Sequence, residues 1–101
     1  MKNVISISAI IGIFIVAVTS TSFSASLFQQ RCAGCHGSTG NKHALGTSPL
    51  LKGQSKEDII KKLNGYQEGT YGGSKKNIMQ SQAKSLSNEQ IEKLAEEISG
   101  F

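Results

Sequence analysis

Five consecutive residues, Cys32 to His36, constrain this chain more than any other feature. The segment reads Cys-Ala-Gly-Cys-His, so two thiols and one imidazole lie close together, separated only by small side chains. These are the chain's two cysteines. Such a cluster can bind a metal ion, act as a redox-active thiol pair or attach a cofactor covalently. The fold has to be built around this segment.

The Cys-x-x-Cys-His pattern is typical of c-type haem attachment. The two thiols can add across the two haem vinyl groups, and the two intervening residues let both sulfurs reach one edge of the porphyrin. His36, next in sequence, can then place its imidazole under the iron. We therefore predict one haem c, attached at Cys32 and Cys35, with His36 as an axial iron ligand.

Two other chemistries compete for the same residues. A closed structural zinc site needs four protein ligands, and this chain offers only Cys32, Cys35, His36 and His43, crowded into one short stretch. A thioredoxin-like thiol pair comes with a βαβ pattern, and no segment here alternates apolar and polar residues as a strand does. The sequence favours haem over both.

A haem iron in an electron carrier usually takes a sixth ligand, and a methionine thioether raises the reduction potential. Met79 is the one methionine beyond Met1, and it follows a glycine- and lysine-rich stretch rather than lying within an apolar helical stripe. We predict that it is the second axial ligand. His43 is the competing candidate, but it lies only seven residues after His36, and we expect a solvated loop histidine.

The first 25 residues differ in character from the rest. A lysine at position 2 precedes an apolar run, residues 4–18, and small residues follow it, which is the layout of a secretory signal peptide. The run is shorter than the roughly 18 residues of a spanning helix, so a retained anchor is the weaker alternative. We predict a signal peptide over residues 1–25, cleaved on export to the periplasm, and one domain over residues 26–101.

A domain of that size has little core of its own and usually needs a staple such as a cofactor. Without Lys2 it carries ten basic and seven acidic residues, and the lysines are spread along the chain. Nucleic-acid binding would require basic residues massed on one face. We expect neither nucleic-acid binding nor stable membrane insertion after cleavage.

Apolar spacing and capping signals predict an all-α fold of three to four helices. Ser87 and Gln90 form a capping box for the final helix, which ends at Gly100. The residues between positions 37 and 53 have four glycines and the chain's proline, and they predict a long loop wrapped around a ligand. Earlier helices are expected at residues 26–35, 56–64 and 75–81.

Several short motifs resemble a known family, the small class I cytochromes c of bacteria, and in particular the periplasmic cytochrome c-553 type. The likeness covers the whole of residues 26–101. The matching segments, after Cys-Ala-Gly-Cys-His-Gly, are Ser48-Pro49-Leu50, Lys52-Gly53-Gln54, Gly69-Thr70-Tyr71-Gly72-Gly73, Lys76-Asn77-Ile78-Met79 and the helix capped after Leu86.

The resemblance implies that His36 is the proximal ligand and Met79 the distal one. It further implies that the Pro49 carbonyl accepts a hydrogen bond from the other nitrogen of His36, and that Tyr66 and Tyr71 pack near the haem or its propionates. The family commonly has an aromatic residue in the last helix facing the one in the first helix. Here Phe28 faces a position occupied by Glu97.

The function expected from these observations is that of a soluble, monomeric electron carrier. Its iron would cycle between Fe(III) and Fe(II), with a cytochrome bc complex, a dehydrogenase, a peroxidase or a terminal oxidase as partner. A small peroxidase or gas-binding protein and a tethered sensing subunit are the rivals. The residues expected to cover the haem faces are Leu27, Phe28, Leu50, Leu51, Ile59, Ile60, Leu63, Ile78 and Leu94.

Overall fold

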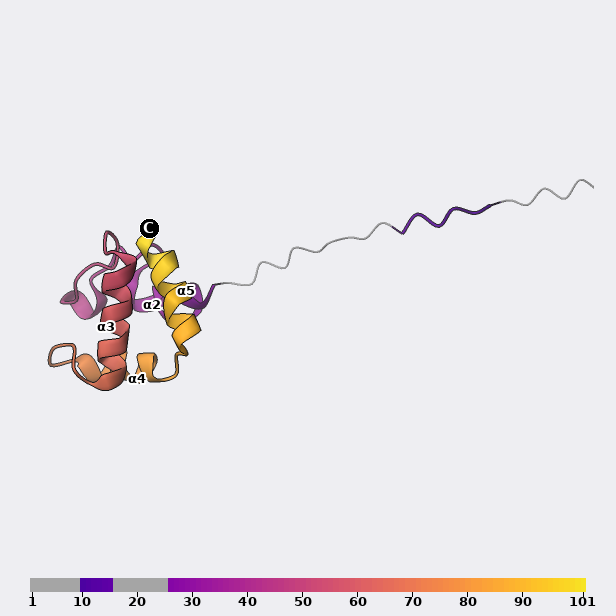
Figure 1. The fold of residues 1–101 in the computed structure, drawn as a ribbon. Helices are drawn as coiled ribbons and strands as arrows, with labels where there is room; N and C mark the ends of the chain where they lie inside the picture. Colours follow the sequence, from indigo (N-terminus) through magenta and orange to yellow (C-terminus); the bar gives the residue numbers. More distant parts are fainter. Residues whose placement is uncertain (1–9, 16–25) are drawn as a thin grey trace, which may run out of the picture.

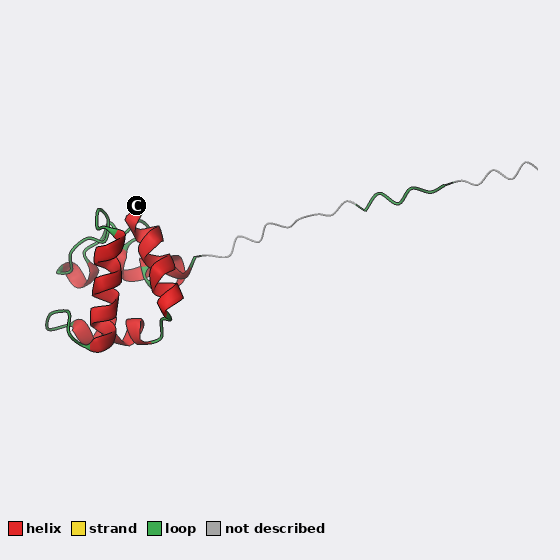
Figure 2. Ribbon diagram, viewed as in Figure 1, coloured by secondary structure: helices red, strands yellow, loops and turns green. Residues whose placement is uncertain are grey.

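The computed structural model describes residues 10–15 and 26–101, so most of the predicted signal peptide, residues 1–25, lies outside the described residues. The described part contains helices and no strand (Figure 2). Its elements are α1 (Leu27–Arg31), α2 (Ala33–His36), the short 3₁₀ helix η1 (Ala44–Gly46), α3 (Lys56–Glu68), α4 (Lys76–Lys84) and α5 (Asn88–Ser99). The all-α prediction is confirmed, with more helices than the three to four expected.

The first predicted helix is divided in two at Cys32. Ser26 begins α1 by accepting a hydrogen bond from the backbone N–H of Gln29. At Cys32 the backbone changes to φ −116°, ψ −37°, and α2 starts at the next residue. The break separates the approach helix from the turn that carries Cys35 and His36. It accounts for one of the additional helices.

The helix predicted over residues 56–64 continues to Glu68. Asn64-Gly65 resembles a helix end, but Gly65 is a buried interior residue of α3, and the left-handed cap is Gly69, at φ 75°. A Cβ added to Gly65 would lie 2.6 Å from Cβ of Tyr71. Glycine is needed here because the following loop packs directly on the helix, which the local sequence does not reveal.

The last two helices lie on either side of a short turn. α4 extends three residues beyond the predicted end at Ser81, and Figure 1 shows it below α3 and α5. α5 has the predicted capping box: Ser87 accepts from the Gln90 backbone, and the Gln90 side chain accepts from the Ser87 backbone. Within the described residues, no helix is long and apolar enough to cross a membrane.

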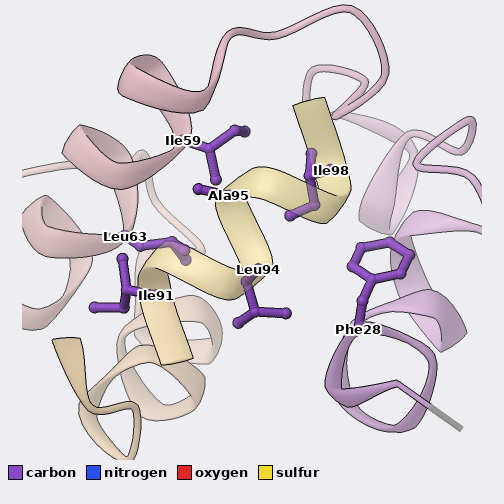
Figure 3. Packing of buried hydrophobic residues seen from close by; sticks show 7 residues of the cluster. All are labelled: Phe28, Ile59, Leu63, Ile91, Leu94, Ala95 and Ile98. Atoms are coloured by element: carbon purple, nitrogen blue, oxygen red, sulfur yellow. The ribbon is translucent and has the colours of Figure 1, made fainter. Parts of the chain in front are cut away.

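The apolar core is built around α5. Figure 3 shows Ile91 and Ala95 directed toward Ile59 and Leu63 of α3, with Leu94 and Ile98 on the side nearer Phe28 of α1. All of these side chains are buried. The period of about 3.6 residues places Ile91, Leu94, Ala95 and Ile98 on one face, which is why this helix organises the core.

Phe28 has an aromatic partner, although not in the last helix. Its ring meets that of the terminal residue, Phe101, edge to face, with centroids 4.8 Å apart. Glu97 instead accepts a hydrogen bond of 2.7 Å from the Ser26 hydroxyl. A residue beyond the end of α5 supplies the second ring.

The long loop between α2 and α3 is held at Gly40. The Gly40 carbonyl accepts backbone hydrogen bonds from Leu51 and Lys52 at 3.1 and 3.0 Å. A Cβ on Gly40, whose φ is 65°, would lie 2.8 Å from Cβ of Leu51. The two ends of the loop are thereby brought together. Residues 43–49 project between them.

The Phe28–Phe101 contact predicts a measurable coupling. We expect Phe28→Leu and Phe101→Leu each to lower the free energy of unfolding of the intact protein. The loss in the double variant should be smaller than the sum of the two single losses by about 0.5–1.5 kcal/mol. An edge-to-face pair contributes about that much beyond its buried area. Urea unfolding of the four proteins measures the coupling. Strictly additive losses would contradict the contact.

Candidate haem site

The site is a pair of adjoining cavities between the helices. The larger has a volume of about 480 Å³, within the range of small-molecule sites, and Cys32, Cys35, His36 and Met79 all line it. The smaller, of about 80 Å³, reaches the core residues Ile59, Leu63, Leu94 and Ile98. His36 and Met79 line both, so the two cavities form one continuous site.

His36 ends α2 and is the buried polar residue of the core, with 7% of its surface exposed. Its backbone N–H donates to the Cys32 carbonyl at 3.0 Å, and its own carbonyl accepts from Lys42 at 2.9 Å. Burial lowers the pKa of the imidazole below its usual value. The ring is therefore neutral at neutral pH, which is the form that binds a metal.

The hydrogen bond expected between His36 and the Pro49 carbonyl is not made in the structure. His36 Nδ1 is buried and has no hydrogen-bond partner. Pro49 nevertheless lines both cavities together with His36. The loop thus brings Pro49 to the site, but the bond itself is missing from this arrangement, which leaves a buried donor or acceptor unpaired.

The two cysteines differ in exposure. Cys32 is partly buried and packs against the core, whereas Cys35 is exposed. Burial raises the pKa of the Cys32 thiol, and this outweighs the opposite effect of Arg31. A thiol redox pair uses a cysteine of lowered pKa. The environment of Cys32 does not favour that chemistry.

Met79 lies in the first half of α4 and is partly buried against the core cluster. It comes from a different part of the chain than His36, yet both side chains line the same cavities. The preceding residue, Ile78, is 53% exposed and lines only the larger cavity. Met79 thus reaches the site from a helix distant in sequence from His36.

The two tyrosines meet at one side of the site. Tyr66 lies on α3 and Tyr71 on the following loop, with ring centroids 5.0 Å apart, edge to face. Both line both cavities. Burial raises the pKa of the Tyr66 hydroxyl, and Tyr71 adds to the effect. Gly72 permits this packing, since a Cβ there would lie 2.8 Å from the Tyr66 ring.

His43 lines neither of the cavities that Cys32 and His36 border. It is exposed, and its Nδ1 is 2.8 Å from the Ser48 carbonyl. In residues 10–15 and 26–101, no group of three or more histidine, cysteine or acidic side chains could hold a metal ion. The four-residue zinc site considered from the sequence is therefore not assembled.

The apolar walls agree only partly with the sequence. Leu51, Ile59, Leu63, Ile78 and Leu94 line one cavity or the other. The remaining four residues expected at the haem faces line neither cavity. Phe28 belongs to the core cluster, Leu27 and Ile60 pack against that cluster, and Leu50 is exposed.

Three lining residues escaped the sequence analysis: Arg31, Ser48 and Gln82 each line both cavities. They are polar and belong to separate segments, so no local pattern links them. The position of Arg31 directly before the Cys-x-x-Cys-His segment is the one signal that could have drawn attention to it. Leu45 was also missed, since it comes to the larger cavity through a left-handed backbone at φ 56°.

These residues fit the haem that the motif predicts. Two thiols, a neutral buried imidazole and a thioether border one mostly apolar cavity, and the last two are the side chains that fill both axial positions in His/Met cytochromes. The tyrosines and the aliphatic side chains of α3, α4 and α5 supply the apolar surface.

Comparison with known proteins agrees with this arrangement. Residues 24–98 match the family model described as cytochrome c. The chain is 38% identical to cytochrome c-553 of Nitratidesulfovibrio vulgaris (strain DSM 19637 / Miyazaki F), over 98% of each chain. It is 42% identical to cytochrome c-553 of Desulfomicrobium norvegicum, over 81% of this chain and all of that protein.

A third relative is cytochrome c-553 of Helicobacter pylori (strain ATCC 700392 / 26695), 37% identical over 97% of this chain and 96% of the relative. All three similarities extend over most of both proteins, and the span matched by the family model, residues 24–98, contains the Cys-x-x-Cys-His segment. The chain therefore belongs to the cytochrome c family and binds a covalently attached haem c.

Proposed function

We propose that this haem-based electron carrier attaches its haem through Cys32 and Cys35 and uses His36 and Met79 as the two axial iron ligands. The proposal depends on one observation above all. The four side chains, drawn from α1–α2 and from α4, line the same cavity of about 480 Å³. The resemblance to proteins named cytochrome c-553 supports it further.

The bound haem supplies the Fe(III)/Fe(II) couple, and the protein determines how easily an electron enters. A neutral His36 donates a lone pair without first losing a proton. The soft thioether of Met79 favours the reduced metal and raises the potential. With both axial positions taken by protein side chains, little has to rearrange when an electron arrives, and small ligands are kept from the iron.

Cys32 and Cys35 are proposed to hold the cofactor covalently. Each S–H would add across one vinyl C=C of the haem, giving a thioether and placing the sulfur proton on carbon. Cys32 lies at the break between α1 and α2, and Cys35 directly precedes His36. The attachment would therefore fix the porphyrin edge relative to the imidazole, and exposed Cys35 would mark the edge nearest the solvent.

We also propose that residues 1–25 direct export and are removed, so that the carrier works in the periplasm between respiratory redox proteins. Lys75 and Lys76 line the larger cavity, and they precede Met79 on the same segment. Their charge supports a partner with an acidic docking surface. A cytochrome bc complex, a dehydrogenase, a peroxidase and a terminal oxidase are the partner classes proposed.

Replacement of Met79 tests the ligation directly. In the oxidised Met79→Ala protein, the sulfur-to-iron absorption band at the red edge of the spectrum should be lost completely. The reduced variant should bind carbon monoxide rapidly and have a lower reduction potential, because the thioether no longer occupies the sixth position. Absorption spectra and redox titration measure all three.

Ile78→Ala is the matched control, since it changes the neighbouring side chain and removes no ligand. It should keep the band and exclude carbon monoxide. A Met79→Ala protein that retains the sulfur-to-iron band would refute the proposed ligand. Rapid carbon monoxide binding by the unaltered protein would favour a gas-binding or peroxidase function instead.

Removal of the attachment site should prevent folding. The core is one small cluster beside a large apolar cavity, and a chain of this size gains too little from burial to remain folded when the cavity walls face water. We expect Cys32→Ser, Cys35→Ser protein without haem to lose its cooperative thermal transition and most of its helical circular dichroism. A cooperative transition with a native-like helical spectrum would contradict this; residual helix alone would not.

Export can be tested on the protein purified from its cells. Mass spectrometry should find an N-terminus between about Ser24 and Ser26 and a mass that includes one haem, because the small residues there suit signal cleavage. An N-terminus at Met1 on the haem-loaded protein would show that the leader is retained, and would favour the tethered form.

A further inference from the structure

Arg31 connects two parts of the site that are distant in sequence. It is the last residue of α1, directly before Cys32. Its Nη2 donates to the Gln82 carbonyl at 2.8 Å, to the Gln82 side-chain oxygen at 3.2 Å and to the Ser85 hydroxyl at 2.5 Å. The attachment segment is thereby joined to the C-terminal end of α4, the helix that carries Met79.

The position of these bonds on α4 matters. Helix C-termini leave carbonyl groups without intrahelical partners, and a cation there also interacts favourably with the helix dipole. Ser85 is the C-cap of α4. Gln82 is three residues after Met79, so the two lie on the same helical face, and both line the two cavities. Arg31 thus holds α4 about one turn from the thioether.

The N-terminal end of α4 has a longer contact, in which Lys76 Nζ donates to the Gly69 carbonyl at 3.4 Å. Its N-cap, Lys75, makes no side-chain capping hydrogen bond, and its first turn has no acidic residue.

Gln67 of α3 donates to the Ala83 and Leu86 carbonyls, at 2.8 Å each, and so holds α4 on α3. The bonds to α3 would persist without Arg31, while the distance from α4 to the attachment segment would be less restrained.

We propose that Arg31 is a positioning residue for the sixth ligand: it holds Met79 at its distance from the segment Cys32–His36. This rests on the proposed role of Met79 and adds a residue that touches α4 rather than the iron. Loss of Arg31 weakens the Met79–iron bond before it weakens the fold. The fold and the ligation therefore respond differently to its replacement.

The experiment compares Arg31→Ala and Arg31→Lys with the unaltered holoprotein. Carbon monoxide binding to the reduced protein requires Met79 to leave the iron, so its rate reports how firmly the thioether is held. We expect the rate to rise about tenfold in Arg31→Ala, the effect of losing one charge-assisted hydrogen bond. Arg31→Lys, which keeps the charge but not the forked geometry, should recover part of the loss.

A second readout separates positioning from stability. In a urea titration of oxidised Arg31→Ala, the sulfur-to-iron band should disappear at a lower urea concentration than the helical circular dichroism. Glu97→Ala is the matched control, because it removes the bond from Ser26 to α5 and involves no residue of α4. In that control both signals should be lost together, and carbon monoxide should bind no faster than in the unaltered protein.

The outcomes distinguish the two proposals. An unaltered protein without the sulfur-to-iron band would overturn the ligation by Met79, and the inference with it. Suppose instead that the unaltered protein has the band and that Arg31→Ala matches Glu97→Ala in carbon monoxide binding and in urea unfolding. This result would overturn the proposed role of Arg31 and leave the ligation by Met79 standing. If Arg31→Ala protein fails to accumulate, Ser85→Ala repeats the test, because Ser85 is far in sequence from the attachment motif. It should also speed carbon monoxide binding and lower the urea concentration at which the sulfur-to-iron band disappears. A Ser85→Ala protein unchanged in both readouts would overturn the inference.

Discussion

A single apolar cavity determines how the rest of this structure is arranged. Side chains from each of the five α-helices in the described residues line it, among them the cysteines and the histidine of the Cys-x-x-Cys-His segment. The protein core proper is one small cluster around α5. A domain this short buries a smaller share of its surface than a larger one, so its stability is marginal without further support. The proposed haem position would therefore make the cofactor part of the core as well as the redox centre.

The polar groups around the cavity follow from that burial. Removal from water lowers the pKa of His36 and raises that of the Cys32 thiol, so burial favours the uncharged form of both groups. Unpaired charge at such a site would carry a large desolvation cost. The cationic Arg31 lines the cavity as well, but it uses its donors on the end of α4. Electrostatics and packing thus act together on the two segments that carry His36 and Met79.

Glycines allow several of the close contacts that shape the site. Gly65 lets Tyr71 pack against α3, Gly72 accommodates the Tyr66 ring, and Gly40 joins the two ends of the long loop. At each of these positions the absence of a side chain lets another part of the chain approach the glycine backbone closely. This explains why glycine-rich stretches that resemble loops in the sequence include the interior of a helix. It also explains why α3 runs past Asn64-Gly65.

Local residue order was sufficient to determine the all-α class, the haem motif and the capping of α5, because attachment chemistry and helix capping depend on neighbours within about five residues. The identity of the family was also readable from short motifs. Tertiary structure alone decided the break at Cys32, the pairing of Phe28 with Phe101, the missing His36–Pro49 hydrogen bond and the contact of Arg31 with α4. These involve residues that are distant along the chain or a backbone conformation set by packing, and no spacing rule connects them before the chain folds.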